Sequence, residues 1–217
     1  MFRHRALESE AIGERHALVL DRLRAMPWLW KKDPLGVKLD TNGESAGCDL
    51  TPFLREGVAG ALSYSARYPG RMEDMAMFDD FLLFEIEETA ICYEELCLEV
   101  FPPLAIRFGS YRASIVNDID LALDDFEQVC ELTQRQGIDI DGRDTVFRFD
   151  PVSYFDQELC RRAFQLEVDQ VVARLQGNVQ HVARLDDGVF IVATSAVVDR
   201  PEIEAIHHTI SGLLMTQ

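Results

Sequence analysis

Three groups of residues in this chain of 217 combine side chains that could carry out chemistry. They are Gly43–Gly47 with its central Ser45, the pair Glu204 and His207, and the cluster Asp150, Tyr154 and Asp156. The first group has the spacing of a nucleophilic serine, the second that of a carboxylate–histidine metal pair, and the third that of two carboxylates acting as acid and base. Each of these functions depends on the helix or strand that would hold the side chains.

The segment Gly43–Gly47 is a Gly-x-Ser-x-Gly match and resembles the nucleophile elbow of carboxylesterases in the α/β-hydrolase family. That resemblance implies a hydrolase with Ser45 as nucleophile. Its base would be one of three histidines, His181, His207 or His208, and its orienting group a later aspartate. An elbow needs a buried strand before the serine and a helix after it, but a polar Asp-Thr-Asn run precedes this motif and Pro52 follows it. The sequence therefore favours a Gly-rich surface turn, with the hydrolase as an alternative.

The other two groups and the cysteines indicate structural roles. A dimetal site of the helical-bundle type needs two Glu-x-x-His pairs and further carboxylates, and the sequence contains one pair, Glu204 with His207. Ser153 followed three residues later by Asp156 is a capping-box pattern at a helix start. The five cysteines form no Cys-x-x-Cys pair, which favours buried reduced thiols over a disulfide framework or a zinc site. We therefore expect no metal and no cofactor.

The net charge of −17 is concentrated in one part of the chain. Residues 72–134 contain sixteen acidic and two basic residues, whereas the rest contains 22 acidic and 19 basic residues. This excess disfavours nucleic acids and anionic membranes as partners and favours basic proteins. No apolar run reaches the roughly 18 residues of a spanning helix, so we expect no membrane partner. The N-terminal segment is charged from its third residue, and the cysteines are expected to be reduced. Both features predict a cytoplasmic location.

Apolar spacing predicts helices over residues 5–26, 50–64, 85–101 and 118–135. From about residue 104 the pattern changes to short β-like runs between helices, with such runs at 104–111, 145–149, 179–185 and 189–197. This alternation is typical of an α+β arrangement.

The C-terminal part carries the clearest local signals. Two apolar or alternating runs flank Asp187-Gly188, which predicts an antiparallel hairpin, and Asp199 before Pro201 predicts the cap of a last helix. The predicted fold is α+β, with a helix-rich N-terminal half and an antiparallel sheet whose C-terminal β-hairpin packs against helices. We predict a single α+β domain over residues 1–217, with a helical N-terminal subdomain over residues 1–70 as an alternative.

The helices predicted over 85–101 and 118–135 are both amphipathic and acidic. At 100° per residue, the second helix collects six apolar residues on the side expected to be buried, namely Ile119, Ala122, Leu123, Phe126, Val129 and Cys130. Its acidic residues form a stripe spanning roughly 16 Å. Like charges at this spacing destabilise a helix, and solubility alone requires only scattered charge. We therefore predict a docking surface for a basic protein, with a solvated face as the alternative; its residues are Glu87, Glu94, Glu95, Asp120, Asp124, Glu127 and Glu131.

A small, acidic, cysteine-reduced chain without a catalytic motif resembles bacterial immunity proteins. That resemblance implies a cytoplasmic binding protein, not an enzyme, that neutralises a basic bacterial toxin or effector by occluding it. The hydrolase using Ser45 and an acidic secretion chaperone or adaptor are the alternatives. None of these patterns specifies the oligomeric state.

Overall fold

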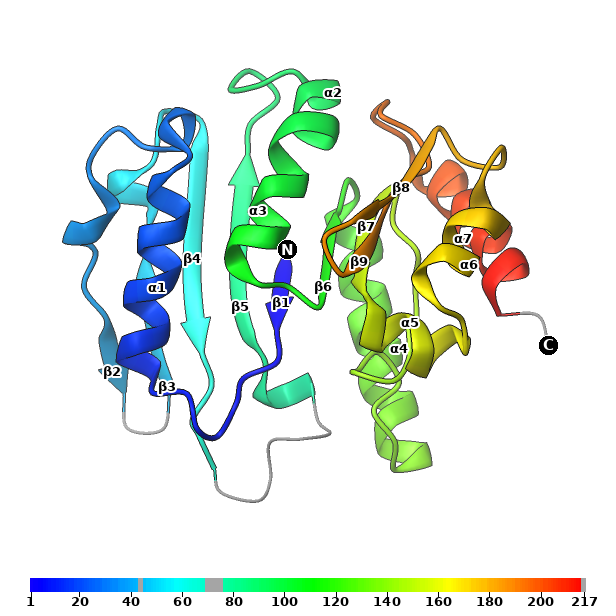
Figure 1. Cartoon of the computed structure of the whole chain (residues 1–217), viewed down its shortest axis with the longest axis horizontal. Coiled ribbons are helices and arrows are strands. Elements are labelled where there is room, and N and C mark those ends of the chain that lie inside the picture. Colours follow the sequence, from blue (N-terminus) through cyan, green and yellow to red (C-terminus); the bar gives the residue numbers. More distant parts are fainter. Residues whose placement is uncertain (43–44, 69–75, 216–217) are drawn as a thin grey trace. The chain divides into compact units, whose positions relative to one another are not determined.

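The computed structural model describes residues 1–42, 45–68 and 76–215. They form two compact units, Met1–Ser110 (unit 1) and Tyr111–Gln217 (unit 2), which are described separately. Each unit combines helices with antiparallel strands, so the predicted α+β class is confirmed (Figure 1). Within the described ranges, no helix has both the length and the apolar character needed to cross a bilayer.

Unit 1 is built on five strands in the order β2-β3-β4-β5-β1, with antiparallel neighbours throughout. The strands are β1 (Phe2–His4), β2 (Asp40–Asn42), β3 (Ser45–Asp49), β4 (Val58–Tyr64) and β5 (Asp80–Ile86). The helices are α1 (Ile12–Arg24), α2 (Tyr93–Glu95) and α3 (Phe101–Phe108), and a π-helical turn at Leu96–Val100 joins the last two. Figure 1 shows α1 and α3 on one face of the strands.

Strand alternation explains why the helices of unit 1 cover one face. Leu62 in β4 and Leu82 in β5 are opposite each other and fully buried, whereas Ala61 and Leu83, one position along, are exposed. Successive strand residues point to opposite faces, so the large buried residues face the helices and the small or exposed ones face away. This second face carries the groove described below.

Unit 2 has four strands in the order β6-β7-β9-β8, again antiparallel. The strands are β6 (Arg112–Ile115), β7 (Val152–Asp156), β8 (His181–Leu185) and β9 (Gly188–Val192). The helices are α4 (Ile119–Gln136), α5 (Gln157–Phe164), α6 (Val168–Leu175) and α7 (Arg200–Leu214). Val189 and Ile191 of β9 share a buried cluster with Leu159, Val171 and Ile210, so the β8-β9 hairpin packs against α5, α6 and α7.

The predictions for the C-terminal part are largely confirmed. Helix 118–135 is α4, and the predicted hairpin is β8-β9. Its turn lies one residue earlier than predicted, at Asp186-Asp187, where Asp186 has a φ of 54°. Asp199 accepts a hydrogen bond from the N–H of Glu202, and the Glu202 side chain accepts from the N–H of Asp199, so a capping box starts α7.

The predicted helix-rich N-terminal half is wrong. Of the described helices with eight or more residues, two lie in unit 1 and four in unit 2. Residues 50–64 form a 3₁₀ turn at Thr51–Phe53 and then β4, because β4 pairs with β3 on one side and β5 on the other. In the segment 85–101, the strand β5 continues to Ile86 and a helix begins only at Tyr93.

Two further strand predictions are wrong. Residues 104–111 were expected to be β-like, but α3 runs to Phe108, ends at Gly109 with a φ of 71°, and is followed by β6 from Arg112. A φ in this left-handed region suits glycine at a helix end. Residues 145–149 have no strand partner among the described residues. The single domain over 1–217, with its 1–70 alternative, stays a prediction.

Candidate functional site

Ser45 lies at the start of a strand. It opens β3, pairs with Asn42 of β2, and the residues after it continue as strand. A nucleophile elbow requires a helix directly after the serine, so elbow geometry is missing at this position. Gly43 and Glu44 of the Gly-x-Ser-x-Gly motif lie outside the described residues.

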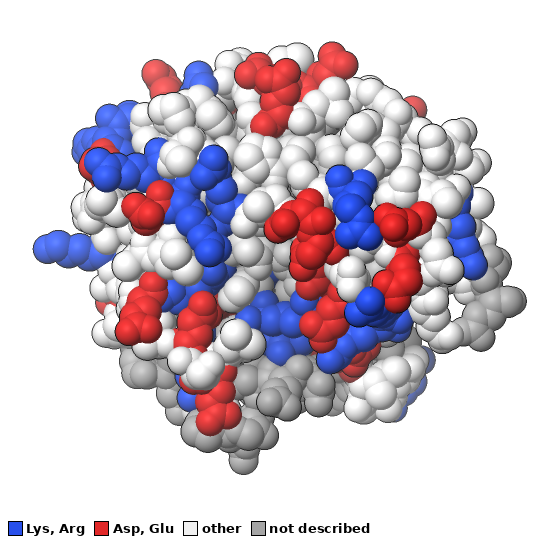
Figure 2. Space-filling model, in the orientation of Figure 1, with Lys and Arg blue, Asp and Glu red and all other residues white. Residues whose placement is uncertain are grey.

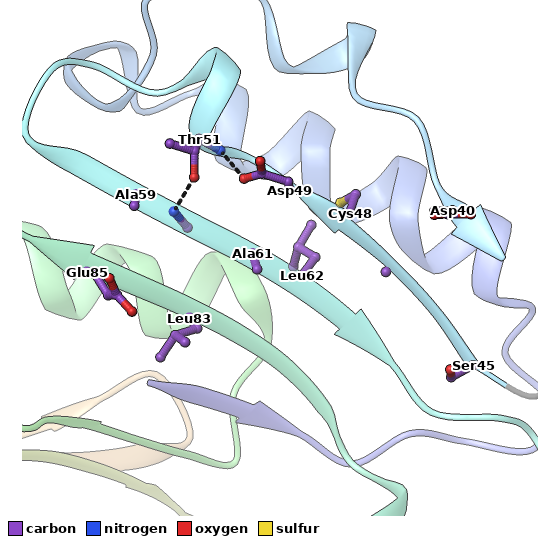
Figure 3. Close-up of a pocket in the computed structure, with 12 residues that line it drawn as sticks. Asp40, Ser45, Cys48, Asp49, Thr51, Ala59, Ala61, Leu62, Leu83 and Glu85 are labelled. Carbon is purple, nitrogen blue, oxygen red and sulfur yellow. Dashed lines mark hydrogen bonds between the residues drawn. The ribbon is translucent and has the colours of Figure 1, made fainter. Parts of the chain in front are cut away.

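A groove of about 570 Å³ lies across β3, β4 and β5, with Ser45 at one end and Glu85 toward the other (Figure 3). Small residues such as Gly47 and Ala61 form its floor, and its lining residues include no histidine, lysine or arginine. Hydrogen bonds from Thr51 lower the pKa of Asp49 at its edge. Among these lining residues, Ser45 therefore has no histidine base to activate it.

The cysteines have two classes of environment. Cys92 and Cys130 are exposed, whereas Cys97 and Cys160 are buried and Cys48 is half-buried in the groove. Burial raises the pKa of Cys48 and of Cys97 to about 11 and that of Cys160 to about 12. Because the thiolate is the reactive form, these three thiols are suppressed as nucleophiles at neutral pH.

We expect two fast-reacting thiols per folded chain. Ellman's reagent at pH 8 should react rapidly with Cys92 and Cys130, and with the other three only after denaturant is added. The paired variant Cys92→Ser and Cys130→Ser should lose the fast phase completely. A fast phase that persists in this double variant would show that a buried thiol is activated.

The C-terminal histidines make contacts within unit 2. His207 Nδ1 accepts a hydrogen bond from the N–H of Phe149 at 3.2 Å, and burial lowers the pKa of His207. His208 Nδ1 donates to the carbonyl oxygen of Glu204 at 2.6 Å, and His181 is exposed on β8. The His207 contact joins α7 to Phe149, whereas the His208 contact lies within α7.

The aspartates of the third sequence group have separate roles. Asp156 caps α5 by accepting a hydrogen bond at 2.7 Å from the N–H three residues later. The hydroxyl of Tyr154 donates to Asp187 at 3.0 Å, and burial raises the pKa of Asp150 to about 6. The predicted capping box is wrong, because Ser153 lies in β7 and donates to the carbonyl of Asp150. The helix begins three residues later than predicted, with Asp156 as its cap.

Part of the acidic segment is internal to unit 1. The side chains of Asp79 and Asp80 are 0% exposed. Asp79 accepts a hydrogen bond from Arg3 at 3.2 Å, and the two oxygens of Asp80 accept from Arg67 at 2.8 and 2.9 Å. These carboxylates are neutralised by arginines from elsewhere in the chain, so they add nothing to a surface field.

Beside them lies a group with metal-ligand residue types. Oxygen and nitrogen atoms of His4, Glu10 and Asp80 lie within 4.8 Å of one another. Arg67 already donates to both oxygens of Asp80, and Arg15 Nε lies 3.9 Å from one of them. Two guanidinium groups therefore supply the positive charge here, and the cluster is an ion-pair network.

The seven predicted partner-binding residues are all exposed. They are divided between the units, with Glu87, Glu94 and Glu95 in unit 1 and Asp120, Asp124, Glu127 and Glu131 in unit 2. Glu87 follows β5, the other two glutamates lie in α2, and the four remaining residues all lie on α4. The acidic stripe of α4 is therefore the larger group within one element.

One member of the acidic stripe is paired within the chain. Arg200 at the start of α7 forms an ion pair with Asp124, which raises the pKa of Arg200. No ion pair involving Asp120, Glu127 or Glu131 is recorded among the described residues. Three of the four carboxylates thus keep their charge available to solvent or to a partner.

The apolar residues of α4 predicted to be buried are largely exposed. Ile119 is 69% exposed, Leu123 is 56% and Phe126 is 65%, and Cys130 is exposed as well. These four residues, the apolar stripe, lie at i, i+4, i+7 and i+11 on one side of the helix. The prediction that this side faces the core is wrong.

A third side of α4, which carries neither the acidic nor the apolar stripe, packs against the rest of unit 2. Of the eighteen residues of α4, Leu121 and Asp125 are buried. Both oxygens of Asp125 accept hydrogen bonds from Arg148, one of them at 2.6 Å, and these bonds raise the pKa of Arg148. Since Asp125 is about 130° from the middle of the apolar stripe at 100° per residue, this anchor turns the stripe outward.

Helix α4 therefore exposes two parallel stripes, one acidic and one apolar. No protein-family model, curated protein or solved structure matches the chain. The surface is thus interpreted from its own side chains. Sequence spacing predicted the acidic stripe correctly, but it placed the apolar stripe in the core and not on the surface. The buried carboxylate of Asp125 marks the side that packs inward, and spacing alone did not identify that side.

Proposed function

We propose that this chain is a protein-binding module that engages a basic protein through α4. The observation that carries the proposal is the exposure of Ile119, Leu123 and Phe126 directly beside an acidic stripe. Single exposed apolar residues are ordinary, but a contiguous row of them is typical of an interaction surface. A partner that covers this row removes its apolar area from water, which stabilises the complex.

The acidic stripe indicates the sign of the partner's charge. Asp120, Glu127 and Glu131 lie along about 16 Å of α4 without a recorded internal cation, so a cationic surface would be attracted and an acidic one repelled. On the face that Figure 2 shows, Lys and Arg side chains lie among the Asp and Glu side chains, so that face does not carry a field of one sign. The proposal is supported by the grouping of acidic residues along one side of α4.

The more specific proposal is an immunity-type inhibitor. In this form the chain acts in the bacterial cytoplasm and occludes a basic toxin or effector, with Glu87, Glu94 and Glu95 of unit 1 as further contacts. Its support is the net charge of −17 together with the exposed stripes of α4. An electrostatically steered inhibitor associates quickly at low salt and more slowly as salt is raised.

The first test reverses charge on α4. The double variant Asp120→Lys and Glu127→Lys should bind the partner at least about tenfold more weakly in 150 mM salt, mainly through a slower association rate. The partner is defined as the protein from the source organism that the wild-type chain retains on a column, and it is then purified. Calorimetry and stopped-flow fluorescence measure the Kd and the association rate.

A matched control is available on α1. Glu14 and Asp21 are exposed helical acids with the same seven-residue spacing, and Glu14, like Asp120, lies in the first helical turn. The variant Glu14→Lys and Asp21→Lys changes the net charge equally and should bind within about twofold of wild type, since screened charges away from the interface contribute little. Equal losses in the two variants would show that overall charge, and not α4, governs binding.

A further inference from the structure

The apolar stripe of α4 has the spacing of a helix-pairing seam. Its members are separated by four, three and four residues, which is the d-a-d-a part of a heptad. Residues at these positions meet a second helix along one line, where each side chain inserts between four residues of the partner. The seam covers about 16 Å of the helix, which is about three helical turns.

The two flanks of this seam differ in charge. Asp120 and Glu127 occupy the e positions beside it, about 80–100° around the helix from Ile119. The g positions on the other flank are Ala122 and Val129, which are uncharged and half-buried. Charges at e and g determine which helix pairs with which, and in what orientation. On α4, therefore, only the flank with Asp120 and Glu127 can select a partner helix by its charge.

The geometry points to one occupant for this surface, an amphipathic helix of a different, basic protein that lies along α4 in heptad register. Its seam carries leucine or isoleucine, and lysine or arginine faces Asp120 and Glu127. This inference rests on the proposed function and names the partner's chemistry. An extended segment would not match a seam that follows the helical repeat of α4.

A second copy of this chain fits the surface less well. In an antiparallel pair of α4 helices the e positions face each other, which sets Asp120 and Glu127 against the same acids of the copy. In a parallel pair they face Ala122 and Val129, which offer no cation. The net charge of −17 adds repulsion in both arrangements. A basic helix has neither disadvantage.

The test uses a synthetic probe peptide with three heptads, leucine at a and d and lysine at e and g. It is added to the full chain carrying Cys92→Ser, in which Cys130 on the seam is the exposed thiol among the described residues. At ten times its Kd, the peptide should slow alkylation of Cys130 about tenfold, because only the free fraction reacts. Comparison peptides have the same composition in scrambled order, or glutamate in place of lysine, and should give no protection.

Seam substitutions provide the second measurement. The variant Leu123→Gln and Phe126→Gln should weaken peptide binding at least about tenfold by fluorescence anisotropy, as expected for apolar anchors of a small interface. The control Leu18→Gln and Leu35→Gln changes two exposed leucines outside α4 and should bind like wild type. Circular dichroism confirms that each variant keeps its helix content.

The outcomes separate the inference from the proposed function. The inference is overturned if the lysine peptide protects Cys130 no better than its scrambled form, or if the seam variant binds it as tightly as wild type does. If the captured basic partner is nevertheless weakened by Asp120→Lys with Glu127→Lys, the proposed function stands and its partner is not a helix in heptad register. If neither probe nor partner depends on α4, both are wrong.

Discussion

Replacing Asp80 with asparagine is expected to lower the free energy of unfolding by about 3–5 kcal/mol. The carboxylate is fully buried, accepts two hydrogen bonds from Arg67 at 2.8 and 2.9 Å and one from the N–H of Ser65 at 3.2 Å, and lies 3.9 Å from Arg15. Asparagine has nearly the same shape as aspartate but no charge. Its amide NH₂ group would replace one carboxylate oxygen and point its N–H donors at a guanidinium group. Arg15 and Arg67 would then lose the buried carboxylate that lies against both, and the longer ion pair of Arg67 with Glu10, at 3.8 Å, would remain.

Urea unfolding followed by tryptophan fluorescence suits this measurement, since both tryptophans, Trp28 and Trp30, lie in unit 1. Glu85→Gln is the matched control, because Glu85 lies in the same strand as Asp80 but is exposed. We expect the control to change stability by less than about 0.5 kcal/mol. A loss below about 1 kcal/mol for Asp80→Asn would show that water, not Asp80, satisfies the guanidinium groups.

The sequence could predict elements whose pattern is set locally. Helix α4, the β8-β9 hairpin and the Asp199 cap all depend on residues within one turn or one repeat of each other. The segment 50–64 shows why the N-terminal half could not be predicted this way. Leu50, Leu54, Val58 and Leu62 recur every four residues and are all buried, which imitates the core side of a helix. Pairing with β3 and β5, which are distant in sequence, overrides that pattern.

The candidate site shows a second limit of the same kind. Periodicity identifies which residues share a side of a helix, but not whether another element covers that side. In α4 the buried direction is set by Asp125, whose partner Arg148 is 23 residues further along the chain. Likewise, the acidic segment looked unpaired because Asp79 and Asp80 find their arginines at positions 3 and 67. Long-range ion pairs decide both questions.

The anchor of α4 leads to the second large effect. Asp125→Ala is expected to lower the stability of unit 2 by about 2–3 kcal/mol, because it leaves the largely buried guanidinium of Arg148 without its carboxylate. Leu121 is then the one buried side chain among the described residues of α4, so the helix should also separate from the rest of unit 2 more often. Hydrogen–deuterium exchange read by mass spectrometry should show faster exchange across residues 119–136 than in α7.

The adjacent residue supplies the control for this prediction. Asp124 is half-exposed and paired with Arg200, so Asp124→Ala removes a surface ion pair and should cost no more than about 1 kcal/mol. Both variants keep Asp120, Glu127 and the apolar stripe, and each loses one negative charge. Asp125→Ala should weaken binding of the basic partner more than Asp124→Ala does, because a surface that is frequently detached must be reordered on binding. If the two variants exchange and bind alike, the Asp125–Arg148 pair does not position α4, and the outward turn of its apolar stripe must have another cause.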